Sequence, residues 1–285
     1  MGYLILGNNM SCKTCVGFSI LMSVYSRESP EFLRESLQSL VESSIVSDEI
    51  VLVEDGPIPD TLKDVIDTFR YVLPIRSVRL DSNIGLAGAL NVGLANCSHE
   101  FVARFDTDDL CEPIRFERQI DFLLKHPEVA AVGSSVQEFE PLTGIPTGFR
   151  SPPETHDALL KFALLSSPLN HPAVMFRKSA VLSVGAYPTN LNTAFEDYAL
   201  WLRLVLAGYR IANLPEVLVR MRAGISQTVR RSGLAYAKQE ITFALEFRKA
   251  GFFSTFHCLR FIFLRVPLRF LPNRLLAYVY QIFRR

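Results

Sequence analysis

The sequence lacks any uninterrupted apolar run of about 18 residues, the length that a membrane-spanning helix needs. Its first residues hold only a short apolar patch at 3–6, without the basic start and long apolar core of a secretory signal. Cysteine is scarce: among five cysteines, Cys12 and Cys15 form a lone C-x-x-C pair with no second ligand pair at zinc-site spacing. We therefore expect no spanning helix, no signal peptide, no zinc site, and free thiols in a reducing compartment.

An excess of charge of either sign is also missing, since 30 basic residues stand against 29 acidic ones and the net charge is +1. The overall charge therefore gives no argument for nucleic-acid binding. The 285 residues are 49% hydrophobic and 21% charged. This composition supports a sizeable core and argues against disorder, and the length suits one large α/β domain or a domain with an appendage.

The first 140 residues alternate between short apolar runs, typical of buried strands, and stretches with helical spacing of apolar residues. Such alternation predicts an α/β fold, with a mostly parallel central sheet covered by helices on both faces. Ligands of open α/β sheets bind beyond the carboxyl ends of the strands. We expect strands at 18–24, 49–53, 75–80, 101–105 and 129–136, helices at 31–44, 62–72, 86–95 and 113–125, and polar clusters after strands at 25–28, 54–56, 81–85 and 106–109.

The second half is less regular. A Pro- and Gly-containing stretch at 141–153 predicts a loop or hairpin. We expect helices at 157–165, 197–207 and 233–249 and short strands at 173–176 and 210–214, with Gly208 and Gly251 ending the last two helices.

The sharpest chemical signal is the acidic stretch from Asp106 to Asp109, which follows an apolar strand. Three carboxylates within four residues repel one another unless a cation sits among them. Mg²⁺ and Mn²⁺ prefer oxygen ligands and are often shared with substrate phosphates. The alternative is that these residues only end the strand and cap the next helix, since Asp favours turns for local reasons.

Three further motifs accompany the acidic stretch in a fixed order: Val53-Glu54-Asp55-Gly56, the segment 82–91, and Phe195-Glu196-Asp197-Tyr198. Together the four motifs resemble those of family 2 glycosyltransferases over roughly residues 18–225. The resemblance implies the nucleotide-sugar-binding fold called GT-A and an inverting, metal-dependent transfer of a sugar to a hydroxyl group.

The resemblance also implies roles for individual residues. Asp108 is the expected direct ligand of Mn²⁺ or Mg²⁺, together with Asp106. Asp197 is the expected catalytic base, with Glu196 as its neighbour. The structural alternative is that both are acidic residues in the first turn of a helix, where they interact favourably with the helix dipole. The nucleotide-sugar pocket is expected to involve Tyr25, Asp55 (on the uracil base), Asn83, Gly85, Asn91 and Asp106.

Two other segments are suggestive. Residues 170–176 resemble a segment near the acceptor side of bacterial polysaccharide transferases, so His171 is a candidate acceptor residue, although a lone His is more often structural. Residues 220–226 resemble a loop that closes over the diphosphate, where Arg222 would pair with phosphate oxygens. Many relatives carry His where this chain has Ala223, which leaves open whether a His or a water completes the metal site.

The C-terminal segment 252–285 contains six arginines, many large apolar side chains and neither Asp nor Glu. Pro267 and Pro272 interrupt it, so it is expected to form helices that lie in the headgroup region of a membrane. The alternative is an amphipathic helix packed on its own domain. Nucleic-acid binding is disfavoured because no recognition motif accompanies the basic residues.

We therefore predict a GT-A catalytic domain over 1–230, with a nucleotide-sugar half at about 18–140 and an acceptor half at about 141–230. Residues 231–285 would form C-terminal amphipathic helices that associate with the membrane. The expected donor is UDP-glucose or UDP-galactose, and the expected acceptor is a polyprenyl-diphosphate-linked N-acetylhexosamine of O-antigen or exopolysaccharide assembly. The enzyme would be cytoplasmic and peripheral on the inner face of the cell membrane.

Alternatives remain open. Another donor sugar, such as rhamnose, mannose or an N-acetylhexosamine, would suit the same fold. A nicotinamide-dependent enzyme would carry G-x-G-x-x-G after the first strand, where this chain has Ser23 to Arg27 without any Gly. A sugar nucleotidyltransferase would show a Gly- and Lys/Arg-rich phosphate loop there, and a scaffold would bind without turnover. The processive-enzyme signature Q-x-x-R-W is absent, which favours one sugar per event.

Overall fold

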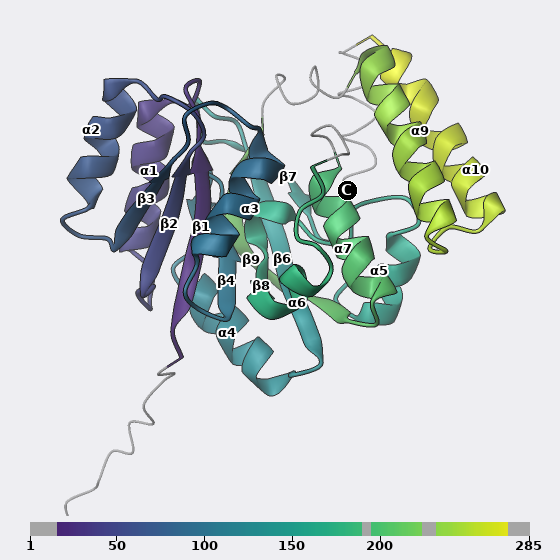
Figure 1. The fold of residues 1–285 in the computed structure, drawn as a ribbon, viewed down its shortest axis with the longest axis horizontal. Coiled ribbons are helices and arrows are strands. Elements are labelled where there is room, and N and C mark those ends of the chain that lie inside the picture. Colours follow the sequence, from purple (N-terminus) through teal and green to yellow (C-terminus); the bar gives the residue numbers. More distant parts are fainter. Residues whose placement is uncertain (1–15, 190–194, 224–231, 273–285) are drawn as a thin grey trace, which may run out of the picture.

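A computed structural model describes residues 16–189, 195–223 and 232–272 of the chain. These residues form a nine-stranded sheet in the order β3-β2-β1-β4-β8-β6-β9-β5, with β7 paired to β6 (Figure 1). The strands are β1 (Phe18–Val24), β2 (Glu49–Glu54), β3 (Ile75–Arg79), β4 (Phe101–Arg104), β5 (Leu110–Cys111), β6 (Val129–Phe139), β7 (Pro146–Arg150), β8 (Met175–Arg177) and β9 (Arg210–Arg222).

The helices alternate with strands in the first half and cluster in the second. They are α1 (Pro30–Val41), α2 (Asp60–Phe69), α3 (Leu86–Asn96), α4 (Arg115–Lys125), α5 (His156–Phe162), α6 (Lys178–Ser183), α7 (Glu196–Leu206), α9 (Gly233–Lys249) and α10 (Thr255–Arg265), with short 3-10 helices η1 (His171–Ala173) and η2 (Val266–Phe270). In Figure 1, α1 and α2 lie at one end of the molecule and α9 and α10 at the other.

Strands β3, β2, β1 and β4 are parallel; β2, β1 and β4 are buried on both faces, whereas the edge strand β3 is partly exposed. Alternate side chains of β1 enter different apolar clusters: Ile20 and Met22 pack in the cluster that also holds α1, α2 and α4 residues, and Leu21 packs in the cluster that holds α3 and α7 residues. Helix α3 approaches closely because Gly93 has no side chain, and an added Cβ would clash with the Leu21 side chain. The expected α/β sheet with helices on both faces is confirmed.

The second half adds antiparallel pairs to this sheet. Strand β8 lies between β4 and β6 and is antiparallel to both, while β9 is parallel to β6. Strand β9 continues to Arg222, well past the expected end at residue 214, even though Pro215 lies within it. A register shift passes over Pro215: Leu214 pairs with Ser134, and the next pair is Val217 with Ser135.

The C-terminal helices α9 and α10 pack on the rest of the described chain through α7. Residues Phe195, Tyr198 and Leu202 share one buried cluster with Phe243 of α9 and Phe261 of α10. A buried ion pair closes this unit, since Glu240, which has no solvent exposure, accepts hydrogen bonds from Arg265 Nε (2.8 Å) and Arg269 Nε (2.9 Å). The division of the chain at residue 230 stays a prediction.

Other expectations about the whole chain have mixed outcomes. None of the described helices is long and apolar enough to cross a membrane. Cys97, Cys111 and Cys258 are buried free thiols, whereas the C-x-x-C pair lies outside the described residues. The stretch at 141–153 forms a hairpin through β7, and the helix expected at 157–165 is α5.

The Glu240 ion pair provides a first test of the fold. Glu240→Ala leaves two arginines without their buried partner, and breaking such a pair costs about 3–5 kcal/mol of unfolding free energy. Glu246→Ala on the same helix is the matched control, because its contact with Arg203 is partly exposed and 3.8 Å long, so we expect a loss of about 1 kcal/mol or less. Urea denaturation measures both, and equal losses would contradict the role given to Glu240.

Candidate active site

Three carboxylates gather in the loop that follows β4. Asp106, Asp108 and Asp109, here called the acidic triad, each offer an oxygen, and these oxygens lie within 4.8 Å of one another. The loop is tied to the end of β1, because the Thr107 hydroxyl donates to the Ser23 carbonyl at 3.3 Å. The expected placement of acidic groups beyond a strand's carboxyl end is therefore seen in the structure.

Burial sets the electrostatics of the triad. Loss of hydration raises the pKa of Asp108 to about 6, and the charge of Asp106 adds to this effect. Burial also raises the pKa of Asp109 well above its ordinary value, with Asp108 as the next cause. Asp109 Oδ2 is buried and has no hydrogen-bond partner among the described residues. Three converging carboxylates, one of them with an unused buried oxygen, fit a hard divalent cation that prefers oxygen ligands.

A buried arginine, which no sequence motif singled out, adjoins the triad. Arg104 is 2% exposed and its Nη2 forms an ion pair with Asp106 Oδ1. Its Nε and Nη1 are buried and have no hydrogen-bond partner within the described ranges. The sequence signal for Arg104 is a single cation at the end of the apolar run of β4, directly before the acidic stretch.

A second pair of carboxylates begins helix α7. Glu196 is 7% exposed, whereas Asp197 is half-buried. Burial raises the pKa of Glu196 to about 7, the charge of Asp197 adds to the rise, and the charges of Arg104 and Asp106 also act on this group. The triad and the pair therefore belong to one electrostatic environment, although they lie far apart in the sequence.

Aromatic packing fixes the start of α7. The ring of Phe195 lies 5.1 Å from that of Phe243 and 5.4 Å from that of Tyr236, centroid to centroid. The hydroxyl of Tyr198 donates to the Ala163 carbonyl at 2.5 Å. The ring of Tyr198 also lies 4.6 Å from that of Phe243, so contacts with α9 flank Glu196 and Asp197 on both sides in the sequence, and α9 helps to orient the acidic pair.

Asp55 organises the loop that leads into α3. Its Oδ1 accepts the Ile84 N–H at 2.7 Å and its Oδ2 accepts the Gly85 N–H at 3.1 Å. The Asn83 side chain donates back to the Asp55 carbonyl at 3.2 Å. Gly56 allows this close approach, since its φ is +84° and an added Cβ would lie 2.7 Å from the Asn83 nitrogen. Each carboxylate oxygen has a further lone pair, so the predicted contact of Asp55 with a base remains compatible with these bonds.

The end of β1 joins the two parts of the candidate pocket. Tyr25 follows β1 directly and is half-buried. The Asp55 N–H donates to the Val24 carbonyl at 2.8 Å, next to the Ser23 carbonyl that holds Thr107. Tyr25 is thus adjacent in the chain to the residues that anchor both Asp55 and the triad. Its nucleotide contact stays a prediction.

Asn91 and His171 both contact Tyr187. The Asn91 side chain donates to the Tyr187 carbonyl at 2.8 Å and accepts the Tyr187 N–H at 2.9 Å. His171 Nε2 lies 3.0 Å from the Tyr187 hydroxyl, and burial lowers the pKa of His171 well below its usual range. A neutral, packed His171 has a structural role in this structure. The substrate contacts expected of Asn91 and His171 stay predictions.

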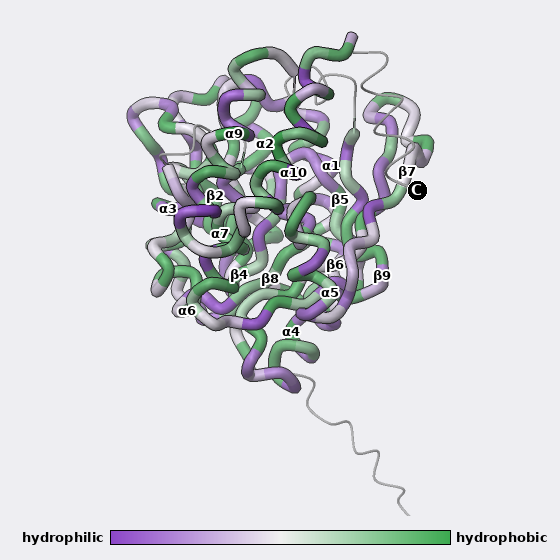
Figure 2. Tube along the Cα trace, turned by 90° about the vertical axis from the view of Figure 1, so that its right-hand side faces the viewer, coloured by the Kyte–Doolittle hydropathy of each residue, from purple (hydrophilic) through white to green (hydrophobic). Residues whose placement is uncertain are grey.

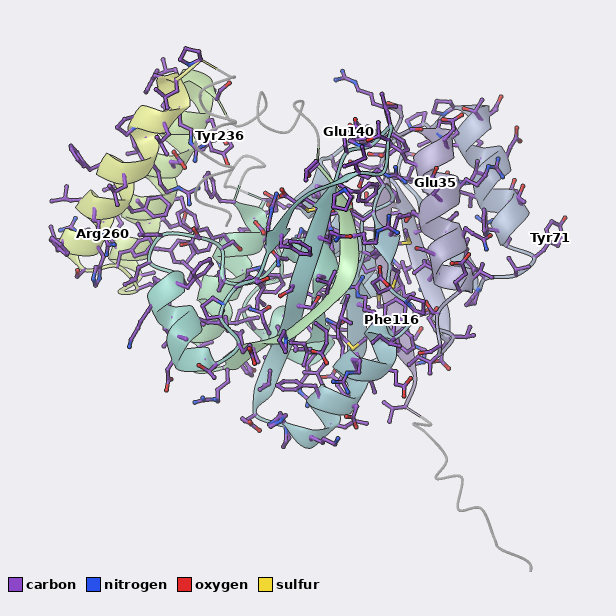
Figure 3. All side chains as sticks on the ribbon, turned by 180° about the vertical axis from the view of Figure 1, so that it is seen from behind. Glu35, Tyr71, Phe116, Glu140, Tyr236 and Arg260 are labelled. Carbon is purple, nitrogen blue, oxygen red and sulfur yellow. The ribbon has the colours of Figure 1, made fainter. Side chains whose placement is uncertain are left out.

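Arg222, at the end of β9, is engaged by protein groups. Its backbone N–H donates to Asp109 Oδ1 at 2.9 Å, and its guanidinium donates to the Asp108 carbonyl and to Glu35 on α1. The guanidinium carbon also lies 4.1 Å from the ring centroid of Phe32. Figure 3 labels Glu35 at the same end of the molecule as Glu140, next to the 141–153 hairpin.

These contacts make Arg222 a positioning residue for the acidic triad in the described structure. Its expected pairing with phosphate oxygens stays a prediction. The remainder of the loop at 220–226, from Gly224 onward, lies outside the described residues, and Ala223 donates its backbone N–H to the Phe139 carbonyl at 3.0 Å.

The fold and this acidic site define a GT-A glycosyltransferase. The sequence profile described as Glycosyl transferase family 2 matches residues 19–183, and the chain belongs to that family. It is 41% identical over 268 residues to the amylovoran biosynthesis glycosyltransferase AmsE of Erwinia amylovora, covering 93% of this chain and 98% of that protein.

Two further comparisons bear on the site. The chain is 38% identical over 264 residues, covering 93% of itself and 95% of the relative, to the Escherichia coli UDP-Gal:alpha-D-GlcNAc-diphosphoundecaprenol beta-1,3-galactosyltransferase. Its fold is similar, with a TM-score of 0.62 and 18% identity, to the mannosyltransferase PcManGT from Pyrobaculum calidifontis in complex with GDP-Man and Mn²⁺, covering 81% of this chain and 64% of that one. The expected family and fold are confirmed.

Removal of one triad carboxylate should reveal a cation site. We expect Mn²⁺ to raise the melting temperature of the protein in a concentration-dependent way, because an ion that binds only the folded state stabilises it. Asp108→Asn should abolish most of that rise and, in the presence of EDTA, melt at a temperature equal to or above that of the unmodified protein, since one repelling charge is gone. Differential scanning fluorimetry measures both effects. The control is Asp121→Asn, an exposed partner of Lys125 on α4. A full Mn²⁺ response in Asp108→Asn would rule the residue out as a ligand.

Proposed function

We propose that this glycosyltransferase moves a hexose, glucose or galactose, from a UDP-sugar to a lipid-diphosphate-linked N-acetylhexosamine, with inversion at the anomeric carbon. The observation that carries the proposal is the single electrostatic cluster formed by the acidic triad, Arg104 and the Glu196–Asp197 pair. The activity in the name of the Escherichia coli relative, and the amylovoran biosynthesis named for the Erwinia relative, support an O-antigen or exopolysaccharide acceptor.

The acidic triad would hold the metal ion, Mn²⁺ or Mg²⁺. Asp106 and Asp108 are the proposed ligands, and the position of Asp109 makes it a further candidate. A bound divalent cation supplies neutralisation of the charge that builds on a departing diphosphate. The PcManGT complex, which contains Mn²⁺ together with GDP-Man, supports this assignment. Tyr25, Asp55, Asn83, Gly85 and Asn91 would border the nucleotide.

Asp197 is the proposed base that takes the proton from the acceptor hydroxyl. Its half-buried side chain is accessible to a substrate, whereas Glu196 is almost fully covered. A pKa of about 7 keeps Glu196 partly protonated near neutral pH, so the pair carries less than two negative charges. Of the two carboxylates, Asp197 is therefore the one that a substrate can reach.

The place of action follows from the proposed acceptor. A lipid-linked diphosphate sugar is anchored in a membrane, so the enzyme would work at the inner, cytoplasmic face as a peripheral protein. The alternative within the same family is another donor, such as rhamnose, mannose or an N-acetylhexosamine. A screen of UDP-glucose, UDP-galactose and their N-acetyl forms against a synthetic diphosphate-lipid N-acetylhexosamine, with Mn²⁺ present, tests the proposal. No product with any hexose donor would contradict it.

Substitution of the proposed base provides a sharper test. Asp197→Asn keeps the size of the side chain but cannot accept the proton, so we expect turnover to fall by at least about 100-fold, the usual contribution of general base catalysis. Donor binding, measured by calorimetry with the UDP-sugar and Mn²⁺, should stay within a few-fold. Asp157→Asn, at the start of α5, is the matched control. Retained turnover in Asp197→Asn would remove this residue from the chemistry.

Arg104 should affect catalysis through the carboxylates beside it. Arg104→Gln removes the buried positive charge that pairs with Asp106, and we expect kcat to fall at least about tenfold, which is about 1.4 kcal/mol of barrier. Arg104→Lys should recover part of the loss because it restores the charge. Steady-state kinetics at varied Mn²⁺ measures the effect, with melting curves to verify folding. Arg118→Gln, an exposed partner of Glu216, is the control, and a kcat unchanged in Arg104→Gln would disprove the role.

A further inference from the structure

Helix α10 presents an uncovered apolar stripe along one side. Phe256, Leu259 and Phe263 are 69%, 62% and 78% exposed, and Phe270 of the following turn is 60% exposed. The three α10 residues are spaced by three and four positions, which places them on a single face of the helix. Figure 2, which views the molecule from the side of α9 and α10, shows that the trace of α10 is largely hydrophobic. Scattered exposed apolar residues are ordinary, but a continuous stripe indicates a contact surface.

The opposite side of α10 is already used by the protein itself. Cys258 and Phe261 point into the buried cluster shared with α7 and α9. Arg265 and Arg269, two of the six arginines in 252–285, are held by Glu240. These two cations stabilise the fold and do not serve an external partner. Contacts within the chain therefore account for only the buried side of α10, and the exposed stripe requires a different partner.

The charges around the stripe indicate which partner. The segment 252–285 has no acidic residue. Arg248 and Lys249 are exposed at the end of α9, and Arg248 Nε donates to the Thr255 hydroxyl at 3.2 Å, directly before Phe256. Arg260 is exposed on α10 itself, and Figure 3 labels it on this helical pair at the edge of the molecule. Large apolar side chains flanked by cations match the interface of an anionic lipid bilayer.

We propose that the exposed stripe of α10 inserts into the headgroup region of an anionic membrane, with Arg248, Lys249 and Arg260 facing the lipid phosphates. The inference rests on the proposed function in so far as it explains how a lipid-anchored acceptor reaches the site. The same helix packs against α7, and α7 begins with Glu196 and Asp197. Docking through α10 therefore brings the proposed base close to the plane in which the diphosphate of the acceptor lies.

The test is sedimentation of the full chain with vesicles of phosphatidylcholine, with and without phosphatidylglycerol. We expect binding to the anionic vesicles that weakens with added salt, and little binding to neutral ones. Phe256→Ser combined with Phe263→Ser should reduce anionic-vesicle binding at least tenfold, and Arg260→Glu should reduce it further. The matched control is Tyr71→Ser combined with Leu142→Ser, which removes two exposed apolar side chains elsewhere and should bind like the unmodified protein.

Turnover on two acceptors separates this inference from the proposed function. The α10 variant should retain full turnover on a water-soluble acceptor with a short alkyl chain, and lose turnover on a polyprenyl acceptor in vesicles. Absence of turnover on either acceptor by the unmodified protein, with vesicle binding intact, would reject the proposed function alone. Unchanged vesicle binding by the α10 variant would overturn the inference. A dimer in solution that dissociates in the α10 variant, without vesicle binding, would assign the stripe to a second copy of the chain instead.

Discussion

The site depends on the buried positive charge of Arg104, which lies beside five acidic groups. Arg104 ends β4, and its ion pair with Asp106 places a guanidinium beside the acidic triad, where its charge opposes the burial that raises the pKa of Asp108 and Asp109. Its field also acts on Glu196 at the start of α7, which is distant from Arg104 in the sequence. In a region of low dielectric, such a fixed charge has a longer reach than it would have in water. Arg104 therefore offsets part of the repulsion among the carboxylates, while an oxygen of Asp109 remains unused by the described residues.

The rest of the structure fixes the positions of these charges. Strand β1 ends between Asp55 and the acidic loop and holds both through backbone carbonyls. Arg222 closes the other side by binding Asp109 and the carbonyl of Asp108 while reaching α1 through Glu35. The anchors on β1 and the acidic loop itself lie at the carboxyl ends of parallel strands. This location explains why a sheet whose interior is largely apolar carries its polar chemistry at one edge.

The sequence predicted the elements whose signals are local. Continuous apolar runs identified β1 and β2, and the spacing of 233–249 identified α9 with the same bounds as in the structure. The order of strands in the sheet could not be predicted from the sequence, because β8 pairs with β4 and β6 through residues that are distant in the chain. The full length of β9 was missed since Pro215 reads as an end when the register shift that accommodates it is unknown.

The same contrast holds for the candidate site. The acidic residues were found because Asp106, Asp108 and Asp197 occur in motifs that can be read along the chain. Arg104 was not singled out, because the role of a lone arginine at a strand end is determined by the carboxylates that the fold places beside it. The six arginines of the tail supported the expectation of helices in the membrane headgroup region, yet Arg265 and Arg269 pair with Glu240 in the interior. Glu240 precedes the tail in the chain, so the composition of 252–285 alone could not reveal the pairing.

The pairing of Glu240 with two arginines also affects how α9 and α10 contact the start of α7. Glu240 and its arginines hold α9, α10 and η2 together as one unit, and this unit packs its aromatic cluster on Phe195 and Tyr198, on either side of the acidic pair. Because a closely packed interior compresses little, a displacement of this unit is passed on to the residues that it contacts. Any surface that positions α10 therefore also positions Asp197. The C-terminal helices are thus part of the structure that holds Glu196 and Asp197 in place.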